Sequence, residues 1–397
     1  MAAKAKATTP PPPATFEQLL ATREIVVTCG SGGVGKTTTA AAAGAMAAVH
    51  LGGKVLVLTV DPARRLATAL GLEQFGNVET QVPASAFAEA GVEPRGELWV
   101  AMLDMKASWD DLVHRYAPDE ETREAILANP LYQNITGKFV QSHDYIAMER
   151  LYEIHVSGRY DLIIVDTPPT RNAIDFLEAP ERMADFFSSR LLRWLTAPAR
   201  SRILSTASKP FYSIADRILG SQFLQDIADF FLLFQTMYDG FVERARSIER
   251  TLADRCTTFV VVSTLDTAPA REAEFFIEAL AERDLHLGAL VLNKVLPEFL
   301  VDPEAGTMAE QVCRDSRAIA ERVVAEGVAG QTDVAQVDRV LTEVAESFVN
   351  YRVVGTREAE EAARLGERPA LVAKVSYLES DVHDLGGLLD LGERLWS

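Results

Sequence analysis

The segment most informative about this chain is Thr28-Cys29-Gly30-Ser31-Gly32-Gly33-Val34-Gly35-Lys36-Thr37-Thr38. From Gly30 to Thr37 it fits the phosphate-loop pattern G-x-x-x-x-G-K-[ST]. An apolar run of β type, residues 25–27, precedes the motif, and an Ala-rich helical run, residues 39–49, follows it. Strand, glycine-rich loop and helix in this order predict a nucleoside triphosphate site, and they disfavour a glycine-rich turn with a chance lysine.

The chemistry of the loop follows from its glycines and from the helix behind it. Backbone N–H groups can turn toward one point, where the helix N-terminus adds partial positive charge. We expect Lys36 to be catalytic and to reach the β- and γ-phosphates, and the Thr37 hydroxyl to hold Mg²⁺. The predicted ATP-binding residues of the loop are Gly30, Ser31, Gly32, Gly33, Val34, Gly35, Lys36, Thr37 and Thr38.

Composition limits the classes of partner. The 397 residues carry a net charge of −18, which argues against a nucleic-acid binder and against electrostatic docking on anionic lipid. The three cysteines, Cys29, Cys256 and Cys313, form no C-x-x-C pair and predict no disulfide framework, so we expect a cytoplasmic protein. Cys29 and Cys256 lie at or beside apolar strand runs, where packing in the core is the expected role.

The N-terminal residues 1–15 are rich in Ala, Lys, Thr and Pro and lack the apolar region of a signal peptide, so we expect a disordered leader. No uninterrupted apolar stretch reaches the roughly 18 residues that a membrane span needs. Residues 16–397 are predicted to form the ATPase domain.

Short apolar runs alternate with helical segments, which predicts an α/β fold with a doubly wound, mostly parallel sheet. The predicted strands are residues 25–29, 55–60, 98–103, 162–165, 259–263, 289–292 and 371–375. Two helical inserts, about 106–158 and 180–252, are expected to form a helical subdomain. Residues 302–366 are predicted to be helical and peripheral, and residues 385–395 a last short helix.

Two aspartates follow predicted strands, at the edge of the sheet where ligands bind. Asp61 is predicted to be catalytic by orienting the attacking water, and the alternative is a helix cap followed by Pro62. Asp166 is predicted to bind ATP and Mg²⁺, the latter through water, with a turn-capping role as the alternative. Asn293 follows another strand, where an adenine contact and an ordinary turn are both open from the residues alone.

Together these segments resemble the arsenical-pump and tail-anchored-protein targeting ATPase family of deviant phosphate-loop NTPases. The matching motifs are Gly30 to Thr38, Thr59 to Ala63, Asp166 to Thr170, Val291 to Asn293 and Glu379 to His383. The run from Asp166 to Leu177 is most similar to the bacterial "anion-transporting ATPase" branch. The resemblance implies an ATP-driven switch that uses Mg²⁺ and forms a face-to-face dimer with ATP at the interface. It also implies roles for Asp61 on the attacking water, Asp166 on the Mg²⁺ shell and Asn293 on adenine.

Four departures from the family pattern qualify this resemblance. The family's signature lysine, which crosses the dimer interface, is Ser31 here, so we expect a heterodimer with a homologue that keeps the lysine. Arg64, Arg65 or Arg171 as a substitute would restore the homodimer. The zinc-clamping C-x-x-C and the metalloid-binding cysteine trio are missing from the sequence, and Arg171-Asn172 replaces the Gly-His of the targeting branch.

Three functions remain to be compared. The favoured one is an ATP-hydrolysing switch that binds and releases a protein partner or an apolar helical client. The apolar row from Phe186 to Phe234 is either a client groove or packed core. A small-molecule kinase or ligase lacks an acceptor motif. A partitioning-type ATPase conflicts with the acidity of the chain and with a C-terminal tail that is not basic.

Overall fold

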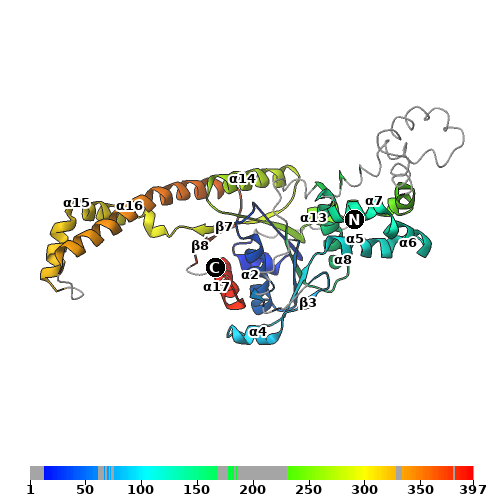
Figure 1. Ribbon diagram of the computed structural model, residues 1–397, viewed down its shortest axis with the longest axis horizontal. Coiled ribbons are helices and arrows are strands. Elements are labelled where there is room, and N and C mark those ends of the chain that lie inside the picture. The colour runs from blue at the N-terminus through cyan, green and yellow to red at the C-terminus, as the bar shows by residue number, and fades with distance from the viewer. Residues whose placement is uncertain are drawn as a thin grey trace, which may run out of the picture.

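An eight-stranded sheet forms the centre of the protein in the computed structural model (Figure 1). The structure describes residues 13–60, 67, 69–70, 72, 76–138, 140–167, 178–179, 181–182, 185, 230–327, 333–378 and 381–396. The strand order is β3-β4-β2-β5-β1-β6-β7-β8, and all neighbours are parallel except β3 and β4. The strands are β1 (Ile25–Cys29), β2 (Lys54–Thr59), β3 (Thr80–Gln81), β4 (Glu97–Met102), β5 (Leu162–Asp166), β6 (Thr257–Ser263), β7 (Leu287–Val295) and β8 (Val372–Ser376).

Every predicted strand is present, and the α/β class with a mostly parallel sheet is confirmed. The sequence did not predict β3, because two residues are too few to show any periodicity. The central strands β1, β5 and β6 are buried along their whole length, which explains their nearly continuous apolar sequences.

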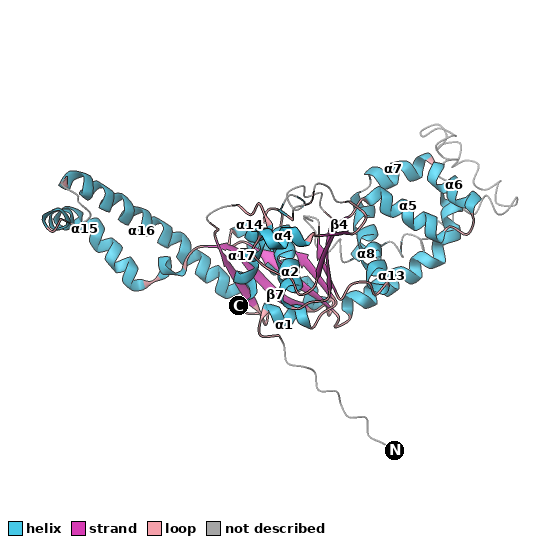
Figure 2. Cartoon of the chain, turned by 90° about the horizontal axis from the view of Figure 1, so that it is seen from below, coloured by secondary structure: helices cyan, strands magenta, loops and turns pink. Residues whose placement is uncertain are grey.

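Helices cover both faces of the sheet, so the fold is doubly wound (Figures 1 and 2). One face packs on α1 (Phe16–Ala21), α2 (Lys36–His50) and α17 (Leu385–Trp396). The Ala-rich sequence of α2 allows a close approach, since a Cβ at Gly44 would lie 2.3 Å from Cγ2 of Val57. The other face packs on helices that include α14 (Thr267–Glu282).

A group of helices lies at the β4 end of the molecule (Figure 2). Its described elements are α5 (Met105–Tyr116), α6 (Glu120–Ala128), α7 (Pro130–Lys138), α8 (Val140–Val156), η1 (Gln235–Met237) and α13 (Tyr238–Ala253), and α4 (Ala84–Glu89) lies apart from them. Aromatic rings from both expected inserts pack in one core. The ring centroids of Trp109 and Tyr145 lie within 6.3 Å of the ring centroid of Phe241.

The aromatic row suggested as a client groove is only partly described. Its last members, Phe230 and Phe234, are buried in this helical core, with their rings tilted and the ring centroids 4.7 Å apart. Their burial supports the packed-core interpretation for this end of the row. Phe186 and residues 187–229 lie outside the described residues.

Two long helices, α15 (Pro303–Ala325) and α16 (Val334–Leu365), form a hairpin that projects from the opposite end of the sheet (Figures 1 and 2). The short helix η2 (Glu298–Val301) joins this arm to β7. Small residues allow the elements of the arm to approach: a Cβ at Gly306 would lie 2.2 Å from the Arg352 guanidinium. The described residues of the range 302–366 are therefore mostly helical and peripheral, as the sequence predicts.

Aspartates begin several helices by accepting backbone N–H groups of the first turn, which otherwise have no partner within the helix. In α15 the cap is followed by proline at the first helical position, where its missing N–H costs nothing. The capping residues are Asp104 of α5, Asp119 of α6, Asp302 of α15 and Asp333 of α16.

Among the described residues, no helix combines the length and the apolar character needed to cross a lipid bilayer.

Candidate functional site

The glycine-rich loop runs from the carboxyl end of β1 to the first turn of α2. Gly30, Gly33 and Gly35 have φ of 149°, 80° and 98°, a region that favours glycine. A Cβ at Gly30 would lie 2.1 Å from the Val262 carbonyl oxygen, and one at Gly35 would lie 2.3 Å from Nδ2 of Asn293. Gly30 and Gly35 are therefore needed for both backbone conformation and space, and Gly33 for backbone conformation alone.

Lys36 begins α2 and folds back over the loop. Its Nζ donates a hydrogen bond to the Ser31 carbonyl oxygen at 2.8 Å, and the residue is buried. The ammonium group is thus held at the mouth of the loop. Thr37 and Thr38 follow in the first turn, and Gly32 and Gly33 are exposed.

A hydroxyl and a carboxylate meet beside the loop. Thr37 Oγ1 donates to Asp166 Oδ2 at 2.6 Å, and Thr59 Oγ1 donates to the same oxygen at 2.9 Å. Asp166 is fully buried at the end of β5. The register pairs Asp166 with Thr28 of β1 and with Thr59 of β2, so three strand ends converge on this carboxylate.

Three threonines that the sequence analysis did not single out fix this arrangement. Thr59 bonds the carboxylate directly, Thr28 Oγ1 donates to the Val165 carbonyl oxygen, and Thr167 Oγ1 donates to the Thr28 carbonyl oxygen. The available signal is the hydroxyl residue at the carboxyl end of each apolar run, because such a residue faces the sheet edge where ligands bind.

Asn293, near the end of β7, contacts the loop. Its Nδ2 donates to the Val34 carbonyl oxygen at 2.8 Å, and its Oδ1 accepts from the Lys294 N–H at 3.0 Å. The side chain thus tethers the phosphate loop in this structure. Its contact with adenine stays a prediction.

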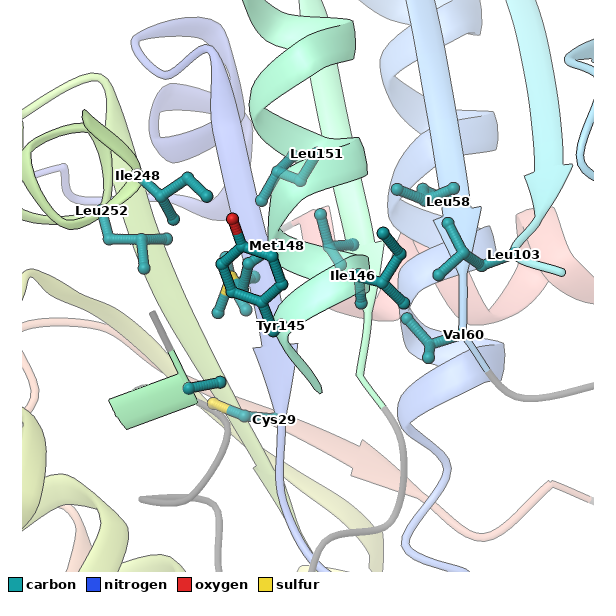
Figure 3. Packing of buried hydrophobic residues seen from close by; sticks show 14 of the residues in the cluster. Cys29, Leu58, Val60, Leu103, Tyr145, Ile146, Met148, Leu151, Ile248 and Leu252 are labelled. Carbon is teal, nitrogen blue, oxygen red and sulfur yellow. The ribbon is translucent and has the colours of Figure 1, made fainter. Parts of the chain in front are cut away.

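Cys29 precedes the first glycine and lies in the core beneath the loop (Figure 3). Burial raises the pKa of its thiol well above 9.0, and the nearby Lys36 ammonium only partly offsets this. The thiol is therefore protonated and inert, which agrees with the packing role expected for it.

The remaining predicted site residues are one aspartate and three arginines. The predicted catalytic Asp61 and the arginines proposed as substitutes, Arg64, Arg65 and Arg171, lie outside the described residues. Strand β2 ends at Thr59, beside Asp166, two residues before Asp61 in the sequence.

The site fits a magnesium-bound triphosphate. A hydroxyl and a carboxylate supply the hard oxygen ligands that Mg²⁺ prefers, directly or through water. The loop presents positive-φ glycines without side chains at the N-terminus of a fifteen-residue helix, where anions bind. Lys36, at the same point, supplies a full positive charge.

A comparison with protein families decides the assignment. The sequence pattern of the ArsA family of ATPases, described as "Anion-transporting ATPase", matches residues 23–326. The chain belongs to this family. The match includes the phosphate loop, Asp166 and Asn293, and it ends at the tip of the arm, so α16, β8 and α17 lie beyond it.

One curated protein is similar to this chain over part of its length. The Streptomyces coelicolor protein named "Uncharacterized protein SCO2128" is 30% identical over 258 residues. The alignment covers 64% of this chain and 58% of that protein. The chain thus spans little more than half the length of this relative, whose printed name gives no activity.

Proposed function

We propose that this ArsA-family chain hydrolyses Mg-ATP and uses the hydrolysis as a switch for binding and releasing a protein partner. The observation that carries the proposal is the bond from Thr37 to Asp166 at the mouth of the glycine loop. Phosphoryl transfer requires mainly positioning and neutralisation of charge, and this pair places a metal-binding hydroxyl against a buried carboxylate.

In the proposed mechanism each residue has a physical task. The glycine loop binds the phosphates with backbone N–H groups, and Lys36 exchanges its bond with the Ser31 carbonyl for the β- and γ-phosphates. Thr37 and Asp166 would hold Mg²⁺, the carboxylate through water, and the bound ion would supply neutralisation of the charge that develops on the phosphates. Asp61 orients the attacking water, a role that rests on the family resemblance.

The proposed switch involves the segment that follows Asp166. The segment after Asp166 begins with Thr167, whose hydroxyl bonds to the Thr28 carbonyl just before the loop. Loss of the γ-phosphate would change the charge beside Asp166, and the proposed switch passes this change to Thr167 and the segment that it begins. We propose that this change in charge alters how tightly the chain binds its partner.

The proposed partner is a homologous subunit that carries the family's signature lysine. Residue 31 is Ser, which supplies no charge, so two copies of this chain would both lack the cross-interface lysine. A lysine-bearing homologue would complete the site of this chain, and the heterodimer would have one faster site. A homodimer with an arginine substitute is the alternative. We also propose a cytoplasmic location, because the three cysteines form no C-x-x-C pair and predict no disulfide framework.

The arm offers support for a helical partner. Along α16, Val340, Val344, Tyr351 and Val354 are exposed, by 49%, 64%, 57% and 45%. Their spacing of four, seven and three residues is that of a heptad seam, with the exposed Ser347 completing it. We propose that an α-helix of the partner packs on this seam, because heptad spacing suits another helix.

Nucleotide binding and product analysis test the proposal. We expect Mg-dependent ATP binding and release of free phosphate, with both reduced in Lys36→Ala. A matched control is Lys106→Ala, which removes a lysine that pairs with Asp110 in the helical group. Transfer of phosphate to a metabolite would instead favour a kinase or ligase. For the seam, Val344→Asp with Tyr351→Asp should abolish capture of the lysine-bearing homologue.

A further inference from the structure

Three potential metal ligands meet at the amino ends of the strands, away from the phosphate loop. Glu24 precedes β1, His155 lies in the last turn of α8, and Cys256 precedes β6. Their ligand atoms all lie within 4.8 Å of one another. The sequence holds only three cysteines and six histidines, so the meeting of one of each with a carboxylate is a specific feature.

The backbone holds this group in place. The N–H groups of Glu24 and Ile25 both donate to the Cys256 carbonyl oxygen, at 2.9 and 3.0 Å. His155 Nε2 lies 2.8 Å from Glu24 Oε2, and Cys256 Sγ lies 3.8 Å from Thr257 Oγ1. The strand ends are therefore fixed relative to each other, and only side-chain rotations are needed to adjust the ligand atoms.

We propose that Glu24, His155 and Cys256 bind one Zn²⁺ ion, which fastens α8 to the amino edge of the sheet. Imidazole nitrogen, thiolate sulfur and carboxylate oxygen are the three protein ligands that Zn²⁺ takes, at about 2.0–2.3 Å. Tetrahedral geometry at those bond lengths separates the ligand atoms by about 3.3–3.8 Å. The 2.8 Å between His155 Nε2 and Glu24 Oε2 is shorter than this range, and no ligand atoms are more than 4.8 Å apart, so zinc binding needs a rotation of the exposed Glu24 side chain.

The surroundings of Cys256 agree with a site for a cation. Zn²⁺ would replace the thiol proton, which leaves to solvent as the Zn–S bond forms. Asp254, whose carboxylate accepts the Cys256 N–H at 2.8 Å, lies next to the group but is not part of it, so water would fill the fourth position on the metal.

The position of the site suggests what it does. His155 is the second-last residue of α8, and Asp254 is the C-cap of α13, so both helices end beside this group. The site lies at the opposite end of β1 from the glycine loop, about 16 Å along a five-residue strand. Bound zinc would therefore stabilise the base of the helical group without occupying the Mg-ATP site.

Zinc binding to the full chain, without tag or nucleotide, tests this inference independently of the ATPase proposal. We expect one equivalent of Zn²⁺ in equilibrium dialysis and a thiolate charge-transfer absorption with Co²⁺. Cys256→Ser should abolish that absorption and weaken zinc affinity about 100-fold or more, since even outer partners of metal ligands contribute 10- to 100-fold. Cys313→Ser, a substitution of a half-buried cysteine on the arm, should change neither.

Two further variants keep the test decisive if Cys256→Ser folds poorly by circular dichroism. His155→Gln and Glu24→Gln should each weaken zinc binding and remove the zinc-dependent rise in melting temperature. The inference is overturned if the wild-type chain binds no zinc, or if zinc binding is the same in the wild type, Cys256→Ser and His155→Gln.

Discussion

Thr37 Oγ1 lies 2.6 Å from Asp166 Oδ2, although 129 residues separate the two in the sequence. The bond joins the first turn of α2 to the buried end of β5, and Thr59 completes it from β2. This contact connects the helix that follows the glycine loop, the proposed phosphate site, to the strand that precedes Thr167.

The first prediction concerns the charge of this carboxylate. Asp166→Asn keeps the shape of the side chain but removes the charge that we propose holds the Mg²⁺ shell, and such a metal stabilises the transition state by several kcal/mol. We expect kcat for ATP hydrolysis to fall about 100-fold or more. The control is Asp161→Asn at the other end of the same strand, where the carboxylate accepts the Lys54 N–H. Equal activity of both variants would refute the assignment.

The second prediction separates backbone strain from steric conflict in the loop. Gly33→Ala introduces only backbone strain, since φ is 80° and no atom lies within 4 Å of the new Cβ. We expect the free energy of unfolding to decrease by about 1–2 kcal/mol. Gly30→Ala adds a clash with the Val262 carbonyl oxygen and should cost more and displace the loop. Chemical denaturation and ATP affinity measure both effects. Equal losses would show that the close approach at Gly30 is unimportant.

The third prediction distinguishes the two roles of Asn293. Asn293→Ala removes the bond to the Val34 carbonyl, worth about 1 kcal/mol, so affinity for ATP and GTP should both decrease. If Asn293 also reads adenine, the preference for ATP over GTP falls about tenfold as well. Competition binding with the two nucleotides measures this preference. An unchanged ratio of ATP affinity to GTP affinity would indicate that Asn293 only tethers the phosphate loop.

The fourth prediction concerns pH and the β3 region. Burial acts to raise the pKa of Glu79, but its backbone hydrogen bond and the Arg159 and Arg150 guanidiniums outweigh burial and hold the pKa below 4.5. The ionised form is therefore favoured by folding, so this stabilisation is complete above pH 4.5 and is lost as the pH falls through the folded-state pKa. The melting-temperature difference between wild type and Glu79→Gln should shrink below pH 4.5.

Glu89→Gln provides the comparison for this pH experiment, because Glu89 is an exposed glutamate on α4. A difference between wild type and Glu79→Gln that stays constant through acid pH would contradict the assignment of the effect to ionised Glu79.

The sequence predicted much of the fold because the information was local. A glycine loop between an apolar run and a helix, and strands that are apolar throughout, specify a buried parallel sheet from residues close together in the chain. Strand β3 was missed because two residues carry no pattern. The family was also predicted from the motifs and is confirmed by the match over residues 23–326.

Contacts between distant segments were harder to predict. Thr28 and Thr59 support Asp166 only because the strand order places β5 between β1 and β2. Cys256 was expected in the core, yet it is only half-buried and meets His155 and Glu24 at the edge of the sheet. No spacing rule joins residues 24, 155 and 256, since the topology alone brings them together.

The central claim is that this chain hydrolyses Mg-ATP in a site completed by a lysine-bearing homologue. Phosphate release should therefore be measured for this chain, for the homologue, and for their mixture with wild-type or Asp166→Asn chain. The account predicts a slow rate for this chain, a rise on mixing beyond the sum of the two, and loss of that rise with Asp166→Asn. Full activity of this chain without the homologue, or a rise that survives Asp166→Asn, would contradict it.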